Sequence, residues 1–505
     1  MNLVLISPEI CVLATAVVVI LADMFFQRKS ILATISLIGL AAAFGFTIYL
    51  WGGNEQATFA NMLVVDKFAL FFKLLFPVMA ALVILASIDY VSKFDDFQGE
   101  YYALVLLSTM GMMLISAATD FISIFVALEL ISISLYALVG FLKDAKSTEA
   151  SLKYLLLGAI ASAILLYGMA FIFGFTGKTQ LGDIASAIRS MSLGGASTAP
   201  GLMLGLVLLI VGFGFKIAAF PFQMWVPDVY EGAPTPITAY LSVASKAAGF
   251  AIILRIFYSA FSLPTWLSHD WGMIFAVLAA IGMTVGNIVA IPQTNIKRML
   301  AYSSIAQAGY LILGIATMGL SPTMNHLGQS SLIFFLAGYA VTNLGAFIAV
   351  IALSNKVGSD RISDYDGMGK RAPMISLALT LCLISLTGIP PTAGFMAKFY
   401  IFSSAVQHDL LWLVIIAVLN SVISAYYYLR VVKVMWFNEP KFEGSVPTSV
   451  ALRSALIISC AGVIILGVLP NYAIKLAEIA AKMFAFWFGL PLFSTASCRN
   501  SVSSV

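Results

Sequence analysis

Long apolar stretches recur along almost the whole chain and are separated by short polar segments. A helix of roughly 20 apolar residues is long enough to cross the hydrocarbon core of a bilayer. The pattern therefore predicts an all-α, polytopic membrane protein. Counted on that basis it has about fourteen spans, near residues 3–25, 31–51, 68–91, 101–118, 120–142, 150–175, 201–227, 235–260, 271–291, 297–319, 328–354, 373–404, 409–436 and 450–469.

Composition supports this class and argues against several others. Of the 505 residues, 61% are hydrophobic and 10% are charged, which no water-soluble domain matches. The net charge of +4 is small, so the lipid bilayer is an expected partner and nucleic acid is not. The four cysteines form no CxxC pair, and no two histidines make a credible pair of haem ligands. We expect no metal or cofactor on this chain, and any redox chemistry in a partner.

Basic residues between the predicted helices are distributed unevenly between the two sides of the membrane. If successive loops alternate sides, one side holds chiefly Lys67, Lys178 and Arg189. Positively charged loops favour the cytoplasmic side, so we expect the richer side to face the cytoplasm and both termini to lie opposite. The richer side holds Arg28, Lys29, Lys93, Lys143, Lys146, Lys297, Arg298, Lys356, Arg361, Lys370, Arg371, Lys433 and Lys441.

An amphipathic segment follows the last predicted span. In "NYAIKLAEIAAKMFAFWFGLP", Lys475, Glu478 and Lys482 share one helical stripe, opposite Ile479 and other apolar residues. We expect this segment to lie in the membrane interface or against a neighbouring subunit.

Four charged residues lie too deep in predicted spans to reach the membrane surface: Glu129, Lys216, Lys246 and Lys398. A charge at that depth costs about 2.5 to 3.5 kcal/mol on insertion scales, so intramembrane charges usually serve a function. One carboxylate cannot neutralise three separate lysines. We therefore expect lysines that release a proton readily when buried and hold it when a glutamate is near. The alternative is that they form ion pairs that only hold helices together.

Lys153 is a weaker candidate of the same kind. It lies near the start of its predicted helix, where a lysine side chain can extend to the membrane surface.

Prolines and glycines interrupt the helices that carry the deep lysines. Pro221 and Pro227 fall in the helix of Lys216, and Pro234 and Pro236 open the helix of Lys246. Similarly, "GIPPTAGFMAKF" places a proline pair and a glycine before Lys398. Broken helices leave backbone groups free, which is tolerated at membrane depth only inside protein or beside water. Their coincidence with lysines favours an ion path near the middle of the membrane.

The chain also contains a faint internal repeat. "FGFKIAAFPF" and "LTGIPPTAGFMAKF" are both interrupted lysine helices. An odd number of helices per repeat makes the second copy inverted, so we expect two inverted five-helix repeats, each containing a broken helix. The predicted division is residues 1–100 for three N-terminal helices, 101–260 and 261–436 for the repeats, and 437–505 for the last span, the amphipathic segment and a polar tail.

Three long motifs resemble the antiporter-like proton-translocating subunits of respiratory complex I and its relatives. They are "PFQMWVPDVYEGAPTPITAYLSVASKAAGF", "NIKRMLAYSSIAQAGYLILG" and "SLTGIPPTAGFMAKFYIF", and they occur in the order of that family. The likeness covers nearly the whole chain. A lysine at position 398 and the lack of a long lateral helix after the last span narrow the resemblance to one of the shorter subunits.

The resemblance implies roles for individual residues. The family's fifth-helix glutamate falls on Glu129, its sixth-helix lysine on Lys153 and its seventh-helix lysine on Lys216. The central eighth-helix lysine falls on Lys246, and the ionisable residue of the twelfth helix on Lys398. Further polar groups are expected to order water between the last two lysines: Tyr302, Ser303, Ser304, Gln307, Thr342 and Asn343.

The resemblance also implies a setting. The chain would belong to the membrane arm of an NADH:quinone oxidoreductase, in a bacterial inner membrane, beside other membrane-arm subunits. NADH or another donor, flavin, iron–sulfur clusters and quinone would bind in partner subunits. Three alternatives stay open: a subunit of a multi-subunit sodium/proton antiporter, a subunit of a hydrogenase- or ferredoxin-linked pump, and a scaffold that moves no protons.

Overall fold

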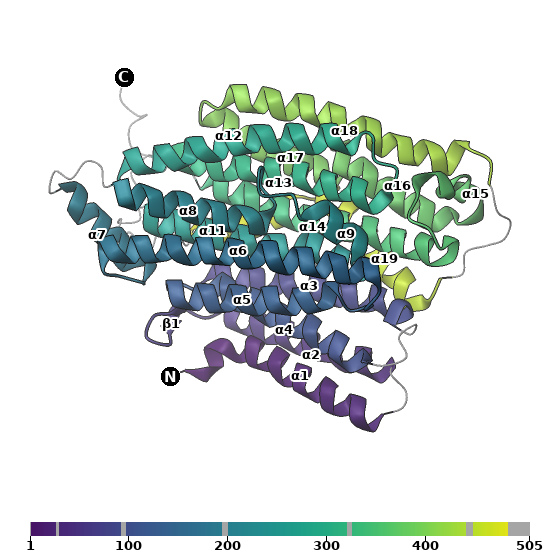
Figure 1. Cartoon of the computed structure of the whole chain (residues 1–505), viewed down its shortest axis with the longest axis horizontal. Helices are drawn as coiled ribbons and strands as arrows, with labels where there is room; N and C mark the ends of the chain where they lie inside the picture. The colour runs from purple at the N-terminus through teal and green to yellow at the C-terminus, as the bar shows by residue number, and fades with distance from the viewer. Residues whose placement is uncertain are drawn as a thin grey trace, which may run out of the picture.

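Helices that run side by side along the long axis of the molecule make up almost all of the chain (Figure 1). The computed structural model describes residues 2–26, 30–91, 97–193, 200–320, 326–440 and 448–482. In chain order the first elements are a 3-10 helix (Leu3–Ile6), α1 (Ser7–Phe25), α2 (Ser30–Trp51), β1 (Gln56–Thr58), β2 (Leu63–Val65), α3 (Lys67–Val91), α4 (Gln98–Ala117), α5 (Phe121–Val139), α6 (Ala145–Thr176), α7 (Leu181–Leu193), α8 (Pro200–Ile217) and α9 (Val226–Gly232).

The second half of the chain is built in the same way. It comprises α10 (Thr235–Tyr240), a π-helical turn (Leu241–Ser245), α11 (Lys246–Phe261), α12 (Thr265–Ala290), α13 (Ile296–Leu320), α14 (Leu327–Val357), a 3-10 helix (Ile362–Tyr365), α15 (Met368–Arg371), α16 (Pro373–Thr387), α17 (Ala393–Gln407), α18 (Leu411–Phe437), α19 (Val450–Val468) and α20 (Asn471–Lys482).

The predicted membrane spans are confirmed. Within the described ranges, 13 helical stretches are long and apolar enough to cross a membrane, with α10, the π-helical turn and α11 counted as one. The remaining predicted span, 373–404, is present as two half-helices, α16 and α17, on either side of a break. The chain is a multi-pass, all-α membrane protein whose only described strands form the short hairpin β1–β2.

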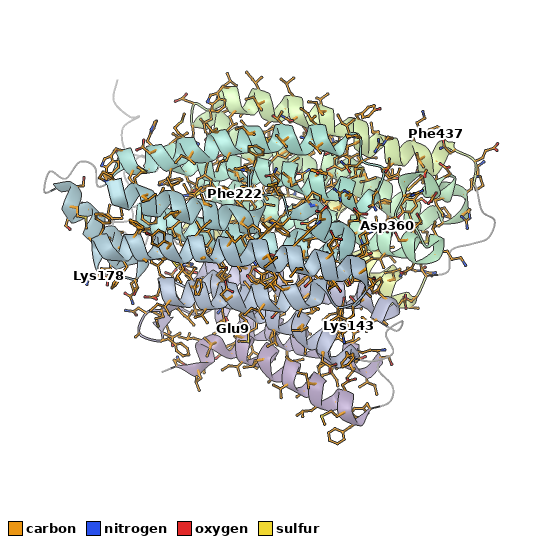
Figure 2. The ribbon with its side chains drawn as sticks, in the orientation of Figure 1. Glu9, Lys143, Lys178, Phe222, Asp360 and Phe437 are labelled. Carbon is orange, nitrogen blue, oxygen red and sulfur yellow. The ribbon has the colours of Figure 1, made fainter. Side chains whose placement is uncertain are left out.

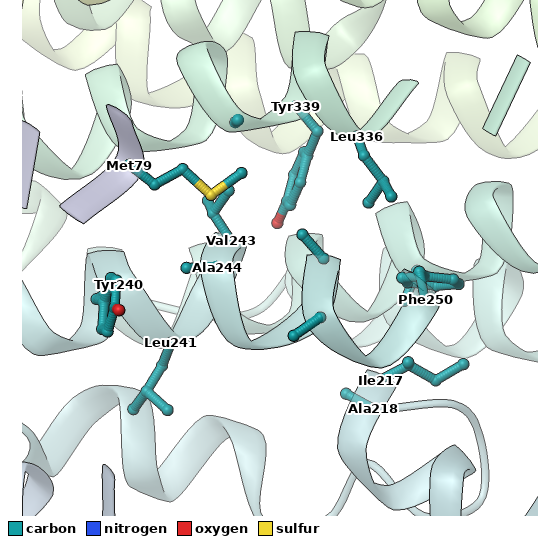
Figure 3. Close-up of a cluster of buried hydrophobic side chains, with 14 of the residues drawn as sticks. Met79, Ile217, Ala218, Tyr240, Leu241, Val243, Ala244, Phe250, Leu336 and Tyr339 are labelled. Carbon is teal, nitrogen blue, oxygen red and sulfur yellow. The ribbon is translucent and has the colours of Figure 1, made fainter. Parts of the chain in front are cut away.

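The core of the molecule is the span Thr235–Phe261 together with α13 and α14. In the most apolar 18-residue window of these three spans, 100%, 94% and 89% of the residues are buried, against 33% for α6 and α19. Figure 3 shows side chains from several helices meeting here, with the hydroxyl of Tyr339 turned toward the segment of Val243 and Ala244. The outer helices expose Leu, Ile and Val instead, as a lipid-facing surface requires.

Charged residues lie at both ends of the helix bundle. Lys143, Asp360 and Phe437 lie toward one end, and Lys178 lies at the other end (Figure 2). The basic residues that were assigned to one side and that the structure describes include Lys146, Lys297 and Arg361, beside Lys143 and Asp360. Arg28, Lys29, Lys93 and Lys441 lie outside the described residues.

The described part of the amphipathic segment contacts other helices of the same chain. This part, α20, packs against α14 and α3 of the same chain and buries Ala477, Ala480 and Ala481 there. Small alanine side chains allow this close packing, whereas Glu478 of the predicted charged stripe is half-buried and the apolar Ile479 is exposed. The rest of the segment and the polar tail lie outside the described residues.

Candidate functional site

Lys246 lies in the middle of the most buried span, with only 1% of its surface exposed. Its Nζ donates to the carbonyl oxygen of Ser304 at 2.8 Å and to the Ser304 hydroxyl at 2.6 Å. The same hydroxyl accepts a hydrogen bond from Tyr339 at 2.9 Å and lies 3.4 Å from the hydroxyl of Tyr230. No carboxylate lies within ion-pair distance of Lys246 in the described part of the chain. Neutral oxygens alone surround this lysine.

The helix around Lys246 is irregular for local reasons. Pro234 precedes α10 and Pro236 lies in its first turn, where a missing N–H costs nothing. A π-helical turn, Leu241–Ser245, then ends directly before Lys246. Such turns are frequent at functional sites because they disturb the regular backbone hydrogen bonds. The start of the helix was predicted, whereas the π-helical turn has no sequence signature that we recognised.

Lys398 is held by the break between α16 and α17. Its Nζ donates to the carbonyl oxygens of Leu386 and Thr387, at 3.0 and 2.9 Å, and to the Ser421 hydroxyl at 2.8 Å. Those carbonyls belong to the last turn of α16, which ends at Thr387 before Gly388 adopts a positive φ of 93°. Carbonyls at a helix C-terminus lack partners in the helix and attract cations. The predicted break therefore creates the acceptors for the predicted lysine.

Two polar residues of α13, Ser304 and Gln307, lie near Lys246 and Lys398 respectively. Gln307 lies one turn after Ser304 on α13, and its Nε2 donates to the Leu386 carbonyl at 3.1 Å. That is the carbonyl that also accepts from Lys398. Gln307 and Lys398 further line one small cavity of about 10 Å³, the size of a single water molecule. The expected row of polar groups between the two lysines thus includes Ser304 and Gln307.

The other expected polar residues lie around this row. Asn343 donates to Ser242 at 2.7 Å, on the span of Lys246. Thr342 lies 3.1 Å from the hydroxyl of Ser385, and Ser303 is hydrogen-bonded to Tyr428. Among the described residues, no hydrogen bond joins Tyr302 to the row.

Lys216 and Glu129 lie close together but do not form a direct ion pair in the structure. Lys216, in the last turn of α8 and 5% exposed, donates to the Ser132 hydroxyl at 3.0 Å. Ser132 lies one turn after Glu129 on α5, and Glu129 accepts a hydrogen bond from Ser162 at 2.5 Å. Ser132, Ser162 and Lys216 line a second small cavity of about 10 Å³. The two charges interact electrostatically, and serine hydroxyls lie between them.

A glycine brings Lys216 close to the span of Lys246. Gly249 lies one turn after Lys246 on α11. A Cβ at this position would fall 2.8 Å from Cγ2 of Ile217 and 3.4 Å from Cγ of Lys216. The end of α8 therefore packs directly on α11 where only hydrogen occupies the contact.

Lys153 lies apart from these lysines. It is 42% exposed and forms ion pairs with Glu149 at 2.7 Å and with Asp228 at 2.9 Å. Both are surface partners, as a lysine near a helix start can reach. The structure does not bring Lys153 together with Lys216, Lys246 or Lys398.

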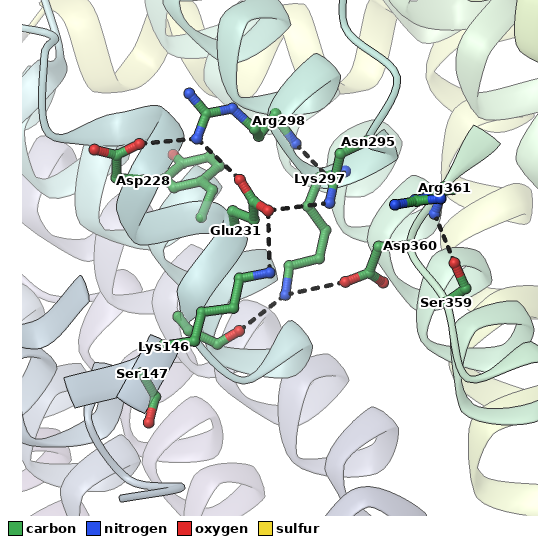
Figure 4. A network of polar contacts seen from close by, with 12 residues as sticks. Lys146, Ser147, Asp228, Glu231, Asn295, Lys297, Arg298, Ser359, Asp360 and Arg361 are labelled. Atoms are coloured by element: carbon green, nitrogen blue, oxygen red, sulfur yellow. Dashed lines mark hydrogen bonds and ion pairs between the residues drawn. The ribbon is translucent and has the colours of Figure 1, made fainter. Parts of the chain in front are cut away.

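The partners of Lys153 belong to a network of charges where α9 meets α6 and α13 (Figure 4). Arg298 contacts Asp228 at 2.8 Å and Glu231 at 2.9 Å, and Lys146 contacts Glu231 at 3.0 Å. Partial burial raises the pKa of Asp228, but the hydrogen bonds from Lys153 and Arg298 outweigh burial and leave the pKa below its usual value. Asp228 consequently stays ionised at neutral pH.

Comparison with known proteins places this geometry in a family. The family model described as "NADH:quinone oxidoreductase/Mrp antiporter, TM" matches residues 118–424, which is more than half of the chain and includes all five predicted site residues. The chain belongs to this family. Its relatives include the NADH-quinone oxidoreductase subunit N of Dehalococcoides mccartyi, which is 51% identical over 95% of this chain and 99% of that protein. Subunit N of Trichlorobacter lovleyi is 47% identical over 95% and 97%.

Solved structures of the NADH:quinone oxidoreductase/Mrp antiporter family have the same fold. A chain of respiratory complex I from Thermus thermophilus with bound aureothin is 30% identical, with a TM-score of 0.78 over 94% of this chain and 99% of that chain. A chain of an archaeal membrane-bound sulfane sulfur reductase is 26% identical, with a TM-score of 0.85 over 96% and 98%. A chain of the Mrp complex from Dietzia shares the fold at 19% identity, with a TM-score of 0.82 over 96% and 98%.

Two buried ion pairs lie outside the site that the sequence predicted. Lys73 on α3 contacts Glu9 on α1 at 2.7 Å, and the two side chains are 0% and 3% exposed. Arg255, two turns beyond Lys246, binds both carboxylate oxygens of Asp66 at 2.9 and 3.0 Å. Glu9, Asp66 and Lys73 precede the segment that the family model matches. The sequence did contain a signal for both ion pairs, because all four of their residues are charged and lie in or beside apolar spans.

Two cysteines that look isolated in the sequence meet in the structure. Cys382 on α16 and Cys460 on α19 are free cysteines whose side chains lie near each other. Cys498 lies outside the described residues. Among the described residues, no group of three or more His, Cys, Asp or Glu is placed to hold a metal ion.

Proposed function

We propose that this chain is a proton-translocating subunit in the membrane arm of a bacterial NADH:quinone oxidoreductase. The proposal rests on one observation above all: Lys246 and Lys398 are buried without a described carboxylate partner, and Ser304 and Gln307, one turn apart on α13, contact Lys246 and the Leu386 carbonyl that accepts from Lys398. The subunit N relatives, which align with nearly the whole chain, support the same function.

In the proposed path a proton enters from the cytoplasmic side and binds Lys216. Glu129 stabilises the charge on Lys216 through the serine-lined cavity between them. The proton then passes to Lys246, beside the contact at Gly249, and from there along Ser304 and Gln307 to Lys398. Lysines are suited to this transfer because burial makes them release a proton more readily, which an arginine does not do.

Lys153 takes a peripheral role in this proposal. Lys153 belongs to the charged network of α9, at the point where the proposed path begins. This position supports a role in collecting protons or in orienting the charged side chains there. The helix α9 also continues the broken helix of Lys216, so the network is suited to transmit a change in charge to that lysine.

The proposal includes the predicted internal organisation. Two inverted repeats at 101–260 and 261–436 agree with the positions of Lys216 and Lys398, each beside the break of an interrupted helix. Quinone reduction would drive the pump from other subunits, which would bind NADH or another donor, flavin, iron–sulfur clusters and quinone.

We also propose that the bundle end of Lys146 and Lys370 faces the cytoplasm and that both termini face the opposite side. The basic bias of the loops supports this orientation. Single cysteines at positions 146 and 370, in a background without native cysteines, should not react with a membrane-impermeant reagent added to intact cells. Labelling of both from outside would reverse the assignment.

Replacement of Lys398 tests the proposed function. In inverted membrane vesicles, Lys398→Ala should lower the number of protons taken up per NADH oxidised, while Lys433→Ala, an exposed lysine of α18, should not. Unchanged proton uptake in an assembled Lys398→Ala complex would contradict the proposal. Uptake that depends on sodium would favour the antiporter alternative. A loss of assembly and activity together would favour a scaffold.

A further inference from the structure

A cluster of buried amide and phenol groups lies beside Lys398, where α12, α13 and α18 meet. Asn287 of α12 and Tyr310 of α13 are 0% exposed, and Asn420 of α18 is 3% exposed. The amide nitrogen of Asn287 lies 3.3 Å from the hydroxyl oxygen of Tyr310 and 3.3 Å from Oδ1 of Asn420. None of these three residues was predicted as part of the site.

The hydrogen bonds of Asn287 determine which way its amide points. Its Oδ1 accepts from the Tyr427 hydroxyl at 2.8 Å, and its Nδ2 donates to the Met283 carbonyl oxygen at 2.9 Å. Rotation of the amide by half a turn would place Oδ1 against that carbonyl oxygen, and two acceptors would then face each other. The second amide hydrogen is therefore left for the oxygens of Tyr310 and Asn420.

Glycines bring α12 and α13 close together around this contact. A Cβ at Gly286 would fall 2.6 Å from the backbone nitrogen of Ala306, and a Cβ at Gly309 would fall 2.7 Å from the backbone nitrogen of Met283. Such close packing leaves little room for the two helices to move relative to each other. Tyr310 directly follows Gly309, so it is held both at its backbone and at its hydroxyl.

The ring of Tyr310 lies against the charged end of Lys398. Nζ of Lys398 is 4.7 Å from the ring centroid, within the range of a cation–π interaction. Phe402, one turn after Lys398 on α17, packs on the same ring with the centroids 6.1 Å apart. A ring face attracts an ammonium group more than a neutral amine, because the attraction depends on the positive charge. The other contacts of Lys398 are to neutral oxygens, so the ring adds a stabilisation that is specific to the protonated form.

We propose that Tyr310 is a positioning residue for proton transfer at Lys398: its ring face stabilises the ammonium group, and Asn287 holds the ring there. This inference rests on the proposed function, in which Lys398 binds and releases a proton. A cation–π interaction is weaker than a buried ion pair. It therefore favours protonation of Lys398 without preventing release of the proton, which a carboxylate in the same place would oppose.

Fluorinated phenylalanines at position 310 test the ring face directly. Each added fluorine withdraws electrons from the ring and weakens a cation–π interaction, while the size of the ring changes little. Phenylalanine and its mono-, di- and trifluoro forms are introduced at position 310 of the assembled complex by stop-codon suppression, and proton uptake per NADH is measured in inverted vesicles. We expect uptake to fall stepwise with the number of fluorines, by roughly threefold to thirtyfold over the series.

The same fluorinated series at a second position is the control. Phe334 is a buried ring of α14 that packs on Tyr400, and the fluorinated forms at position 334 should leave uptake unchanged.

Two variants test the role of Asn287. Asn287→Leu removes the amide, and Tyr310→Phe removes the hydroxyl that the amide contacts. Each should lower uptake, and because both act on the same contact, the double variant should lower uptake no further than Asn287→Leu alone. Tyr365→Phe removes a buried hydroxyl that is bonded to Ser354 instead, and it should leave uptake unchanged.

The same vesicles separate a failure of this inference from a failure of the proposed function. Uptake that does not respond to fluorine at position 310, or additive losses in the double variant, would overturn the role of Tyr310 if the complexes assemble and oxidise NADH normally. If Lys398→Ala lowers uptake in the same experiment, the proposed function stands without that role. Normal uptake in Lys398→Ala would contradict the proposed function and this inference with it.

Discussion

The buried lysines of this chain differ in what surrounds each charge. Lys246 and Lys398 lie among hydroxyl and carbonyl oxygens, whereas Lys73 is paired with a carboxylate. Deprotonation costs less free energy for a lysine that is surrounded by neutral acceptors than for a lysine that is paired with a carboxylate. Under the proposed function the same residue type would provide a mobile proton at Lys246 and Lys398 and a fixed charge at Lys73.

Glu129 should matter more for pumping than Lys153. Glu129 is the carboxylate whose charge reaches Lys216, and its removal also leaves the Ser162 hydroxyl without its acceptor. Lys153 is exposed and shares Asp228 with Arg298. We expect Glu129→Ala to lower proton uptake per NADH by a larger factor than Lys153→Ala, measured in inverted vesicles with assembly checked on native gels. Normal pumping and quinone reduction in an assembled Glu129→Ala complex would remove Glu129 from the path.

The sequence was sufficient to find these residues but not the groups that lie beside them. Charges inside long apolar runs are conspicuous, so Glu129, Lys216, Lys246 and Lys398 were identified before any contact was known. Ser132, which accepts a hydrogen bond from Lys216, was not identified, because serines are common in membrane helices as small packing residues and as partners in interhelical hydrogen bonds. The pair Glu9 and Lys73 was also missed, since its members belong to helices that are not neighbours in the chain.

Broken helices are the elements that position this site. The break after α16 frees two carbonyls, and Lys398 binds both. Prolines and glycines predicted the breaks, because they remove a donor or allow a positive φ. The π-helical turn before Lys246 and the hairpin β1–β2 were not predicted, since each is a short feature that tertiary packing selects from residues of ordinary propensity.

The contact at Gly249 should be sensitive to a single added methyl group. In Gly249→Ala the new Cβ would lie 2.8 Å from Cγ2 of Ile217, so Ile217 must move, and we expect the adjacent Lys216 to be displaced with it. Overpacking of this kind costs about 1 to 3 kcal/mol. We expect the complex to assemble and to pump fewer protons per NADH than the parent.

Gly174→Ala is the matched control, because a Cβ at position 174 of α6 meets no atom within 4 Å. It should pump normally. Equal pumping by both variants would show that the distance between α8 and α11 does not limit proton transfer.

Across the whole molecule, the buried lysines and their polar neighbours lie within an apolar core and an apolar outer surface, and the first four helices add a second polar site. Glu9 and Lys73 form their ion pair within the group α1–α4, in which α1 packs on α2 and α4, and α3 packs on the same two helices. Hydropathy predicted the apolar outer surface and the number of spans, because both depend on composition alone. Hydropathy did not predict which polar helix faces contact one another, because that depends on packing between distant parts of the chain.

Removal of one member of the Glu9–Lys73 pair should destabilise the chain. Glu9→Leu leaves an unpaired charge at Lys73, a change that costs about 3 to 5 kcal/mol in a buried site. The double variant Glu9→Leu/Lys73→Met removes both charges and should recover most of the loss. The measurement is the fraction of complex that survives mild heating, on native gels. A single variant as heat-resistant as the parent would contradict a stabilising pair.

The most direct test of the proposed relay is the replacement of Lys246 by arginine. Arginine keeps the positive charge but does not release its proton. Proton uptake into inverted vesicles is measured beside NADH oxidation, for Lys246→Arg and Lys246→Ala complexes whose assembly is verified. We predict that both variants lose uptake to a similar extent, on the order of 100-fold if proton transfer through Lys246 is obligatory. Uptake at the parental rate in an assembled Lys246→Arg complex would mean that Lys246 acts as a fixed charge, and would contradict the relay.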